Sequence, residues 1–454
     1  MPAKKGINRR EFLGSTAVAS AAAFTIVPRR VLGGPGYTAP SDKLNIAGVG
    51  VGGMGKSNVR NCAEAGENIV ALCDVDTDYA SEIIKEFPDA KVYKDFRVML
   101  EKQKDIDAVI VATPDHSHAI VAMTAMQLGK HVYVQKPMTR TVYEARKLTE
   151  AARKYKVATQ MGNQGHSKDS VRTVAEWVAD GAIGPVREVH AWTDRPWWPQ
   201  GVYRPYETPD VPRELDWDLW IGPAPTRPYH PAYHPWSWRG WWDFGTGALG
   251  DMACHVLDVA FTALKLKYPT SIEAHSPRIY VKRGIVKQTM DETPPVASVI
   301  YYHFPARGKM PPVKLTWYDG GMMPPRPEEL EPGRSMGENG LVFIGDKGKI
   351  LMGTYGEGAR LIPESKMKAY KLPPATLPRI KGTHEKNWID ACKGGEPASS
   401  NFDYSGPMTE AVVLGNVAIR AGQKLEWDAA NMKVTNVDEA NQYINPPYRQ
   451  GWTL

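Results

Sequence analysis

A short apolar strand that runs directly into a glycine-rich turn constrains this chain more than any other feature. Residues 44–49 are apolar except for Asn45, residues 56–65 predict a helix, and the turn between them consists of Gly50, Val51, Gly52, Gly53, Met54 and Gly55. The spacing G-x-G-x-x-G between a strand and a helix lets the backbone approach a pyrophosphate and points free N–H groups of the helix at it. A second frame, Gly48-Gly50-Gly53, also fits, but Gly48 is more simply part of the strand. The turn therefore predicts a dinucleotide-binding domain.

An acidic residue at the end of the next strand indicates which dinucleotide binds. The apolar run from Ile69 to Cys73 ends in Asp74, 19 residues past Gly55. An acid at this position is suited to binding the ribose hydroxyls. No Arg or Lys follows nearby in Val75-Asp76, so a 2′-phosphate would be repelled, and NAD is favoured over NADP.

Further strands alternate with helices, as in a doubly wound parallel sheet. Residues 108–113 and 131–134 predict buried strands, and residues 119–128 predict a helix between them. Ligands bind at the carboxyl ends of such strands. The loops at those ends therefore supply the expected nicotinamide contacts, which are Thr113, Pro114, His118, Gln135 and Lys136.

A chain of 454 residues exceeds a single ordinary core, so a second domain is expected. Alternating patterns predict longer strands at residues 187–194, 271–280, 296–304 and 313–318, and a hairpin at 340–345 and 348–352. A helix near residues 407–420 is expected to return to the first domain. We predict an α/β Rossmann domain at 40–164, an α+β domain with a large, mostly antiparallel sheet at 165–430, and a tail at 431–454 that packs on the body.

The first 35 residues are predicted to be a twin-arginine export signal, which places the protein in the periplasm. Asn8-Arg9-Arg10 precedes an Ala-rich run that is too short and too polar to span a bilayer, so no stable membrane span is expected after export. Residues 1–30 carry five of the six net positive charges. The remainder is near neutral and carries no basic footprint for nucleic acid.

Four motifs in this order resemble the Gfo/Idh/MocA family of glucose–fructose oxidoreductase and inositol dehydrogenase. They are the glycine turn, Thr113-Pro114, Lys136-Pro137, and the stretch Gly247-Ala248-Leu249-Gly250-Asp251-Met252-Ala253-Cys254-His255. The resemblance implies a sugar oxidoreductase that associates through the exposed face of its second-domain sheet, hence a homo-oligomer. This family usually has Glu before Lys-Pro, where this chain has Gln135, so the electrostatic environment of Lys136 is expected to differ.

Asp251 and His255 lie at i and i+4 on a helix expected to begin at Thr246, and Asp258 continues the same stripe. Spacing alone is equally typical of a solvated helix face, but the resemblance favours a catalytic one. We predict His255 as the general base, with a pKa near the working pH. Asp251 is expected to orient the imidazole or bind a substrate hydroxyl, and Lys136 to stabilise the alkoxide.

Nine of the fourteen tryptophans fall between residues 192 and 242, which suggests a sugar or cyclitol site, although most of them are expected only to fasten an irregular segment. No metal is predicted, because Pro231 and Pro235 oppose a helix that would align His230 with His234, and the four cysteines lack C-x-x-C spacing. The predicted substrate contacts are Lys136, Asn163, Arg239, Trp241, Asp251 and His255.

These features predict an NAD-dependent oxidoreductase acting on a secondary hydroxyl of a sugar, glycoside or cyclitol, with NAD tightly bound and recycled. The alternative is a glycoside hydrolase that oxidises C3 transiently, eliminates the glycosidic bond and re-reduces. A non-enzymatic NAD- or sugar-binding module is disfavoured, because all three catalytic groups are present.

Overall fold

A six-stranded parallel sheet lies in the N-terminal part of the described chain, residues 45–161, which is called the first half below; the rest is called the second half. The computed structural model describes residues 42–277 and 291–454, so the predicted export signal lies outside the described residues. The chain divides after Leu44, and every element below belongs to the unit from Asn45 onward. The strands of this sheet are, in spatial order, β3 (Lys91–Tyr93), β2 (Asn68–Cys73), β1 (Asn45–Val49), β4 (Ala108–Val111), β5 (His131–Val134) and β6 (Thr159–Met161).

The order of the parallel strands switches between β1 and β4, where strands added on one side of β1 give way to strands added on the other, as in a dinucleotide-binding Rossmann fold. The strands of this sheet are apolar because helices cover both of its faces; in β4, for example, all four residues are buried. The Thr141 and Glu144 side chains form a capping box that starts the last helix of this half. The helices of this half are α3 (Met54–Glu64), α4 (Ser81–Glu86), α5 (Phe96–Lys102), α6 (Asp115–Gln127) and α7 (Val142–Tyr155).

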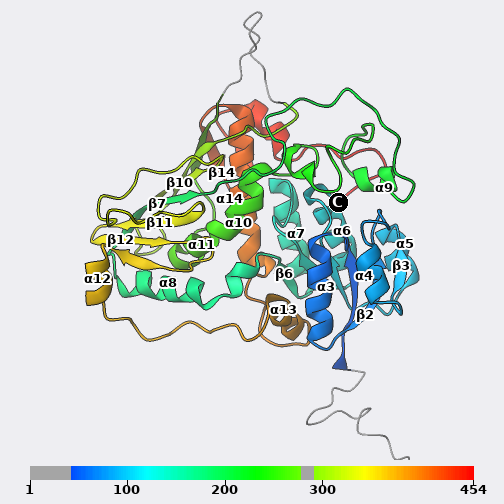
Figure 1. Ribbon diagram of the computed structural model, residues 1–454, viewed down its shortest axis with the longest axis horizontal. Helices are drawn as coiled ribbons and strands as arrows, with labels where there is room; N and C mark the ends of the chain where they lie inside the picture. The colour runs from blue at the N-terminus through cyan, green and yellow to red at the C-terminus, as the bar shows by residue number, and fades with distance from the viewer. Residues whose placement is uncertain (1–41, 278–290) are drawn as a thin grey trace, which may run out of the picture. The chain divides into compact units, whose positions relative to one another are not determined.

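A nine-stranded, mostly antiparallel sheet dominates the second half (Figure 1). One neighbouring pair, β7 and β10, runs parallel, and the predicted hairpin β11–β12 turns over two residues between Gly345 and Gly348. The strands are, in spatial order, β13 (Arg360–Ile362), β12 (Gly348–Met352), β11 (Gly340–Gly345), β7 (Val186–Trp192), β10 (Val313–Tyr318), β9 (Val299–Phe304), β8 (Ser271–His275), β14 (Leu425–Asp428) and β15 (Lys433–Val434).

Most helices of the second half lie between the two sheets or against the large one, and two lie on the side of the first half (Figure 1). They are α8 (Asp169–Asp180), α9 (Trp217–Ile221), α10 (Gly247–Val256), α11 (Asp258–Leu264), α12 (Glu364–Ala369), α13 (His384–Cys392) and α14 (Phe402–Ala421), with 3₁₀ turns η2 (Gln164–Ser167), η3 (Ser237–Gly240) and η4 (Asp438–Tyr443). Helix α14 packs on α7 of the first half, and one hydrophobic core runs through both halves. Among the described residues, no single helix could cross a membrane; only α10 and α11 together, bent by 47°, have the length and apolar character.

The two sheets confirm the predicted fold class, and several element boundaries differ from the predictions. Helix α14 begins five residues before Pro407, because the Asn401 side chain accepts a hydrogen bond from the Asp403 N–H and caps it. Strand β9 begins at Val299 rather than at 296, and β8 ends at His275. The last three residues of the strand predicted at 271–280, residues 278–280, lie outside the described residues.

Candidate active site

A cavity of about 690 Å³ opens at the carboxyl ends of the parallel strands. Its walls come from both halves of the chain: the glycine turn and the loops after β2, β4 and β5 on one side, and α10, η3 and residues 195–198 on the other. Its volume is typical of ligand sites, and its place at the strand ends is where doubly wound folds bind their ligands. The cavity is therefore the candidate active site.

The glycine turn has the geometry that the preferred frame predicts. Gly50 has φ +79°, and a Cβ on it would lie 2.5 Å from the Thr113 backbone nitrogen. A Cβ on Gly55 would collide with the Gly50 carbonyl oxygen, so this glycine allows α3 to pack against the turn. Gly48 lies inside β1, where a Cβ would meet the Val51 side chain at 2.6 Å. These close approaches match the glycine roles of a pyrophosphate-binding turn.

Asp74 lies at the end of β2, beside the turn. Its Oδ2 accepts a hydrogen bond from the Gly52 N–H at 2.9 Å, and its Oδ1 accepts one from the Asp76 N–H at 3.0 Å. Burial raises the pKa of Asp74 to about 6, although these N–H donors act in the opposite direction. The structure also brings Lys94 into the cavity wall, but its ammonium donates to the Glu214 carbonyl oxygen at 2.9 Å.

Most of the predicted cofactor residues line the cavity: Gly50, Gly53, Met54, Asp74, Thr113, Pro114, His118, Gln135 and Lys136. Val51, Gly52 and Gly55 belong to the turn but not to the cavity wall. The ring of His118 lies between the carbonyl oxygens of Pro137 and Thr113, at 2.9 and 2.8 Å, so it joins the two loops that follow β4 and β5. These residues fit a dinucleotide that binds along the glycine turn, with its ribose at Asp74.

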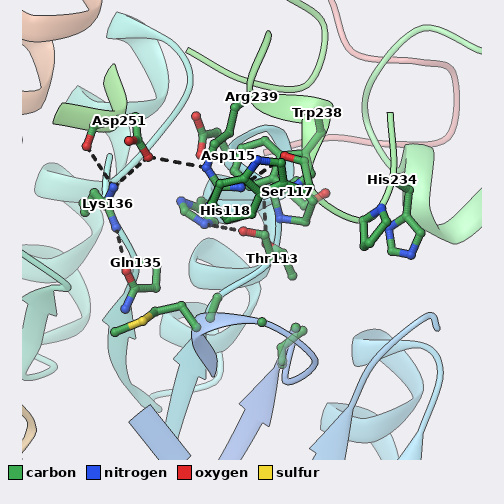
Figure 2. Close-up of a pocket in the computed structure, with 18 of the residues that line it drawn as sticks. Thr113, Asp115, Ser117, His118, Gln135, Lys136, His234, Trp238, Arg239 and Asp251 are labelled. Atoms are coloured by element: carbon green, nitrogen blue, oxygen red, sulfur yellow. Dashed lines mark hydrogen bonds and ion pairs between the residues drawn. The ribbon is translucent and has the colours of Figure 1, made fainter. Parts of the chain in front are cut away.

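An ion-paired cluster lies deeper in the cavity (Figure 2). The Lys136 ammonium donates to Asp251 Oδ1 and to the Asp251 carbonyl oxygen, both at 2.8 Å, and Arg239 Nε approaches the same Oδ1 at 3.4 Å. Burial alone would raise the pKa of Asp251, but the two cations lower it to about 2. Two cations share one carboxylate, which leaves positive charge beside the space where a substrate would lie.

His255 lines the cavity one helical turn after Asp251, with an edge-on contact to Tyr355 at 5.3 Å between ring centroids. Its Nδ1 is buried without a hydrogen-bond partner among the described residues, which leaves Nε2 as the ring nitrogen for a ligand. Burial, with the nearby charge of Lys136, lowers the pKa of His255 to about 3. The ring is therefore neutral at working pH, rather than half-titrated as predicted.

Two expectations for this helix differ from the structure, namely that Asp251 orients the imidazole and that Asp258 continues the stripe; the alternative contact of Asp251 with a substrate hydroxyl stays a prediction. Within the described residues, no hydrogen bond joins Asp251 to His255, because the Asp251 carboxylate turns to Lys136 and Arg239 instead. Asp258 does not continue the stripe, because α10 ends at Val256 and the chain bends by 47° into α11. The Asp258 carboxylate is buried behind the cavity, where it binds His166 Nδ1 at 2.9 Å.

Two predicted substrate contacts, Asn163 and Trp241, lie away from the cavity. The Asn163 amide donates to Asp258 and accepts from the Ser400 hydroxyl, so its polar atoms are occupied. Trp241 is buried, and its indole N–H donates to the Ala232 carbonyl oxygen at 2.8 Å. His234 Nε2 donates to the Asp76 carboxylate at 2.7 Å, and the described residues contain no metal-binding group of His, Cys, Asp or Glu.

Sequence reasoning missed several residues of the substrate side of the cavity: Arg195, Trp197, Trp198, Trp236, Trp238 and Tyr355. The tryptophan cluster was a signal for them, but its irregular spacing could not say which rings face inward. Arg239 lies over the rings of Trp236 and Trp238, at 4.3 and 4.2 Å from their centroids. Aromatic faces beside a guanidinium suit the C–H faces and hydroxyls of a sugar ring.

A hydrogen-bonded relay places a carboxylate behind Gln135. The Gln135 Nε2 donates to Asn58 Oδ1 at 2.8 Å, and Asn58 Nδ2 donates to Glu385 Oε1 at 2.7 Å. Both Asn58 and Glu385 are buried. A buried carboxylate on α13 therefore lies two hydrogen bonds from Gln135.

Asp115, at the first turn of α6, is a further buried acid that the sequence did not single out. It lines the cavity and accepts a 2.6 Å hydrogen bond from the Thr246 hydroxyl. Burial raises the pKa of Asp115 to about 7, against the opposing effects of Thr246, Arg239 and Lys136. Thr246 is the N-cap residue of α10 as predicted, but its hydroxyl donates to Asp115 and makes no capping hydrogen bond to the helix.

We expect Asp115→Asn to stabilise the protein more at pH 8 than at pH 5. A folded pKa of about 7, against 3.8 for an ordinary Asp, means that this group favours folding below pH 3.8 and loses that contribution as the pH rises through 7. The loss at pH 8 is up to roughly 4 kcal/mol, and a neutral amide avoids it. Urea unfolding at both pH values measures the effect. An equal shift at both pH values, or the same result for the exposed control Asp438→Asn, would contradict the assignment.

Comparison with known proteins matches the chain to one family over both halves. Residues 44–163 match the oxidoreductase family with an NAD-binding Rossmann fold, and residues 170–282 match the C-terminal alpha/beta domain of the same family. The fold and site thus define a protein with an NAD-binding Rossmann domain and an α/β companion domain. The chain belongs to the Gfo/Idh/MocA oxidoreductase family, as the sequence motifs predicted.

Individual relatives share part of the chain. A glycosyl hydrolase family 109 protein of Shewanella pealeana is 30% identical over 39% of this chain, and an inositol 2-dehydrogenase of Serratia proteamaculans is 30% identical over 32% of it. The matched segments span 44% of each of these relatives, which is less than half their length. The structure of the Bordetella pertussis WlbA dehydrogenase, in complex with NADH and UDP-GlcNAcA, superposes with a TM-score of 0.58 at 17% identity, over 85% of this chain and 99% of that one. This likeness confirms the fold.

Proposed function

We propose that this protein is an NAD-dependent oxidoreductase that acts on a secondary hydroxyl of a sugar, glycoside or cyclitol. One observation carries the proposal: Lys136, paired with Asp251 at 2.8 Å, and the neutral His255 line the same cavity as the glycine turn. Family membership and the inositol dehydrogenase relative support it. Asp74 at the ribose position favours NAD over NADP.

The side chains of this cavity divide the work of alcohol oxidation. Bound NAD supplies a hydride acceptor for the carbinol carbon. The Lys136 ammonium donates to the substrate oxygen and stabilises the negative charge that develops there. His255 Nε2 accepts the hydroxyl proton, and the developing charge on the substrate offsets the burial that lowers the pKa of this ring. Asp251 holds Lys136 in place, and the Trp238 and Trp236 rings with Arg239 position the sugar.

A second candidate, the glycoside hydrolase, is favoured by the family 109 relative. Oxidation of the C3 hydroxyl to a ketone makes the C2 hydrogen acidic; loss of that proton with departure of the C1 substituent breaks the glycosidic bond. Water then adds at C1, a proton returns to C2, and return of the hydride to C3 restores the alcohol. The reaction needs no net oxidant, and the same Lys136 and His255 serve its first step.

The protein is exported through the twin-arginine route to the periplasm and retains its NAD. Arg9-Arg10 before an Ala-rich run supports export. This route carries folded proteins, so NAD is loaded before export and is re-oxidised within the site by a second sugar. The outer face of the large sheet, which includes the exposed His303 of β9, forms a homo-oligomer contact, and light scattering of the purified protein tests it.

Nicotinamide absorbance of the purified protein tests the proposal directly. The expected result is bound nucleotide whose absorbance rises when methyl β-glucoside or myo-inositol is added. A protein that binds no NAD, or that never transfers hydride from any of a panel of sugars, glycosides and cyclitols, would overturn it. Heavy water separates the two candidates: cleavage with deuterium at C2 supports the hydrolase, and an accumulating keto-sugar without deuterium supports the oxidoreductase.

A further inference from the structure

The C-terminal segment supplies an aromatic side chain to the nucleotide end of the cavity. Asp74 and Lys94, which follow β2 and β3, and Phe96, at the start of α5, line that end. Trp452 lines the same cavity, with its ring centroid 6.5 Å from that of Phe96. In a sheet of this strand order, the ends of β2 and β3 lie on the side of the nucleoside that bears the ribose acid.

Trp452 is held in this position by contacts on two sides. The Arg97 guanidinium lies over its indole ring, 4.5 Å from the centroid. The backbone N–H of Trp452 donates to the Arg449 carbonyl oxygen, and the Arg449 side chain donates to the carbonyl oxygens of Gly222 and Asp218 at the end of α9. Figure 1 shows the C-terminus next to α9, above the ends of the parallel strands. The ring is therefore placed before any ligand arrives.

The segment that contains α9 and anchors Trp452 also contacts the loop that follows Asp74. Leu215 forms an antiparallel bridge with Asp76, and the Asp216 N–H donates to the Val75 carbonyl oxygen at 2.9 Å. Glu214 accepts the 2.9 Å hydrogen bond from Lys94 through its carbonyl oxygen. Residues 214–222 and 449–452 thus form one hydrogen-bonded strap over the nucleoside end of the cavity.

We propose that Trp452 and Phe96 form the adenine subsite of this cavity and that the strap slows the release of the dinucleotide. The inference rests on the proposed function, because it requires that NAD binds along the glycine turn. A purine base stacks favourably on the face of an aromatic side chain, because the base itself presents a flat ring face. Enclosure by the strap gives the retained cofactor of an exported enzyme a structural basis.

Binding of nucleotide fragments to Trp452→Ala tests the adenine subsite. After removal of copurified nucleotide, calorimetry with NAD and with ADP-ribose is expected to show Kd values about 10- to 100-fold above wild type. Nicotinamide mononucleotide, which lacks adenine, is expected to bind both proteins equally. Trp452→Phe is expected to restore most of the affinity, and Trp197→Ala, on the substrate side of the same cavity, to leave it unchanged.

The strap has its own test. Arg449→Ala removes the anchor that holds Trp452 against α9, although Arg449 itself does not line the cavity, and it is expected to weaken ADP-ribose binding and to speed loss of bound NAD during gel filtration. Unchanged ADP-ribose affinity in Trp452→Ala, or equal weakening of nicotinamide mononucleotide, would overturn the inference. If Trp452→Ala does not fold, wild-type ADP-ribose affinity in Arg449→Ala would overturn it in the same way. Wild-type protein that binds neither NAD nor ADP-ribose would instead overturn the proposed function.

Discussion

Replacing Lys136 with methionine is expected to lower kcat about 10²- to 10³-fold while NAD binding is retained. Methionine keeps much of the length of the side chain but removes the positive charge that stabilises the substrate oxygen. The ammonium makes two 2.8 Å hydrogen bonds to Asp251, so its position is fixed before the substrate binds. Single-turnover nicotinamide absorbance, with a sugar that the wild type oxidises, measures the loss of rate.

A matched lysine separates this effect from a general loss of charge. Lys147 lies on α7 and pairs with Glu150 at the surface, so Lys147→Met is expected to keep the wild-type rate. Because Arg239 still neutralises part of the Asp251 charge, Lys136→Met is expected to fold. A wild-type kcat in Lys136→Met would contradict the role of this residue. Loss of NAD affinity along with the rate would show that Lys136 acts on the cofactor instead.

Local patterns predicted the fold because each element carries its own signal. The glycine turn needs φ > 0 at Gly50 and close packing at Gly55, which few other residues tolerate, so its sequence predicts both turn and frame. The hairpin at residues 340–352 is signalled by two apolar runs and a two-residue loop, and it formed with the predicted bounds. The doubly wound parallel sheet follows from the alternation of strands and helices, whereas its strand order does not follow from that alternation alone.

Side-chain partners in the site could not be predicted in the same way, because they depend on long-range packing. The i,i+4 spacing of Asp251 and His255 is real, yet Lys136, from another half of the chain, takes the carboxylate that the spacing assigned to the imidazole. Nothing in the irregular segment distinguishes Trp241, which is buried, from Trp238, which faces the cavity. Trp452 carries no motif at all.

The pKa of His255 is the clearest case of a property set by packing. The sequence indicates an imidazole near its ordinary pKa. In the structure, burial of the ring, which contacts Tyr355, and the nearby Lys136 charge lower the pKa to about 3. Conversely, burial raises the pKa of Asp115 to about 7. The groups that titrate nearest to neutrality in this cavity are therefore the carboxyls of Asp115 and Asp74, and the histidine remains neutral.

His255→Gln is expected to lower kcat about 10²- to 10⁴-fold, because an amide of similar shape cannot take up the substrate proton. NAD affinity is expected to remain, since His255 lies on α10, away from the glycine turn. His131→Gln, at the start of β5 and so at the opposite end of the parallel sheet from the cavity, is the matched control and is expected to keep the wild-type rate. The same single-turnover assay measures both variants, and a wild-type rate in His255→Gln would assign proton transfer elsewhere.

The pH dependence of the rate distinguishes the histidine from the carboxyl. A base whose pKa is lowered to about 3 is in its active, unprotonated form at every pH above that value, so activity through His255 is lost only as the pH falls toward 3. Any change of rate near pH 7 is expected to come from ionisation of Asp115, which adds negative charge near Lys136 and Arg239. Asp115→Asn is expected to abolish that change, and its persistence with a pKa near 6.5 in Asp115→Asn and also in Asp74→Asn would return the titration to His255.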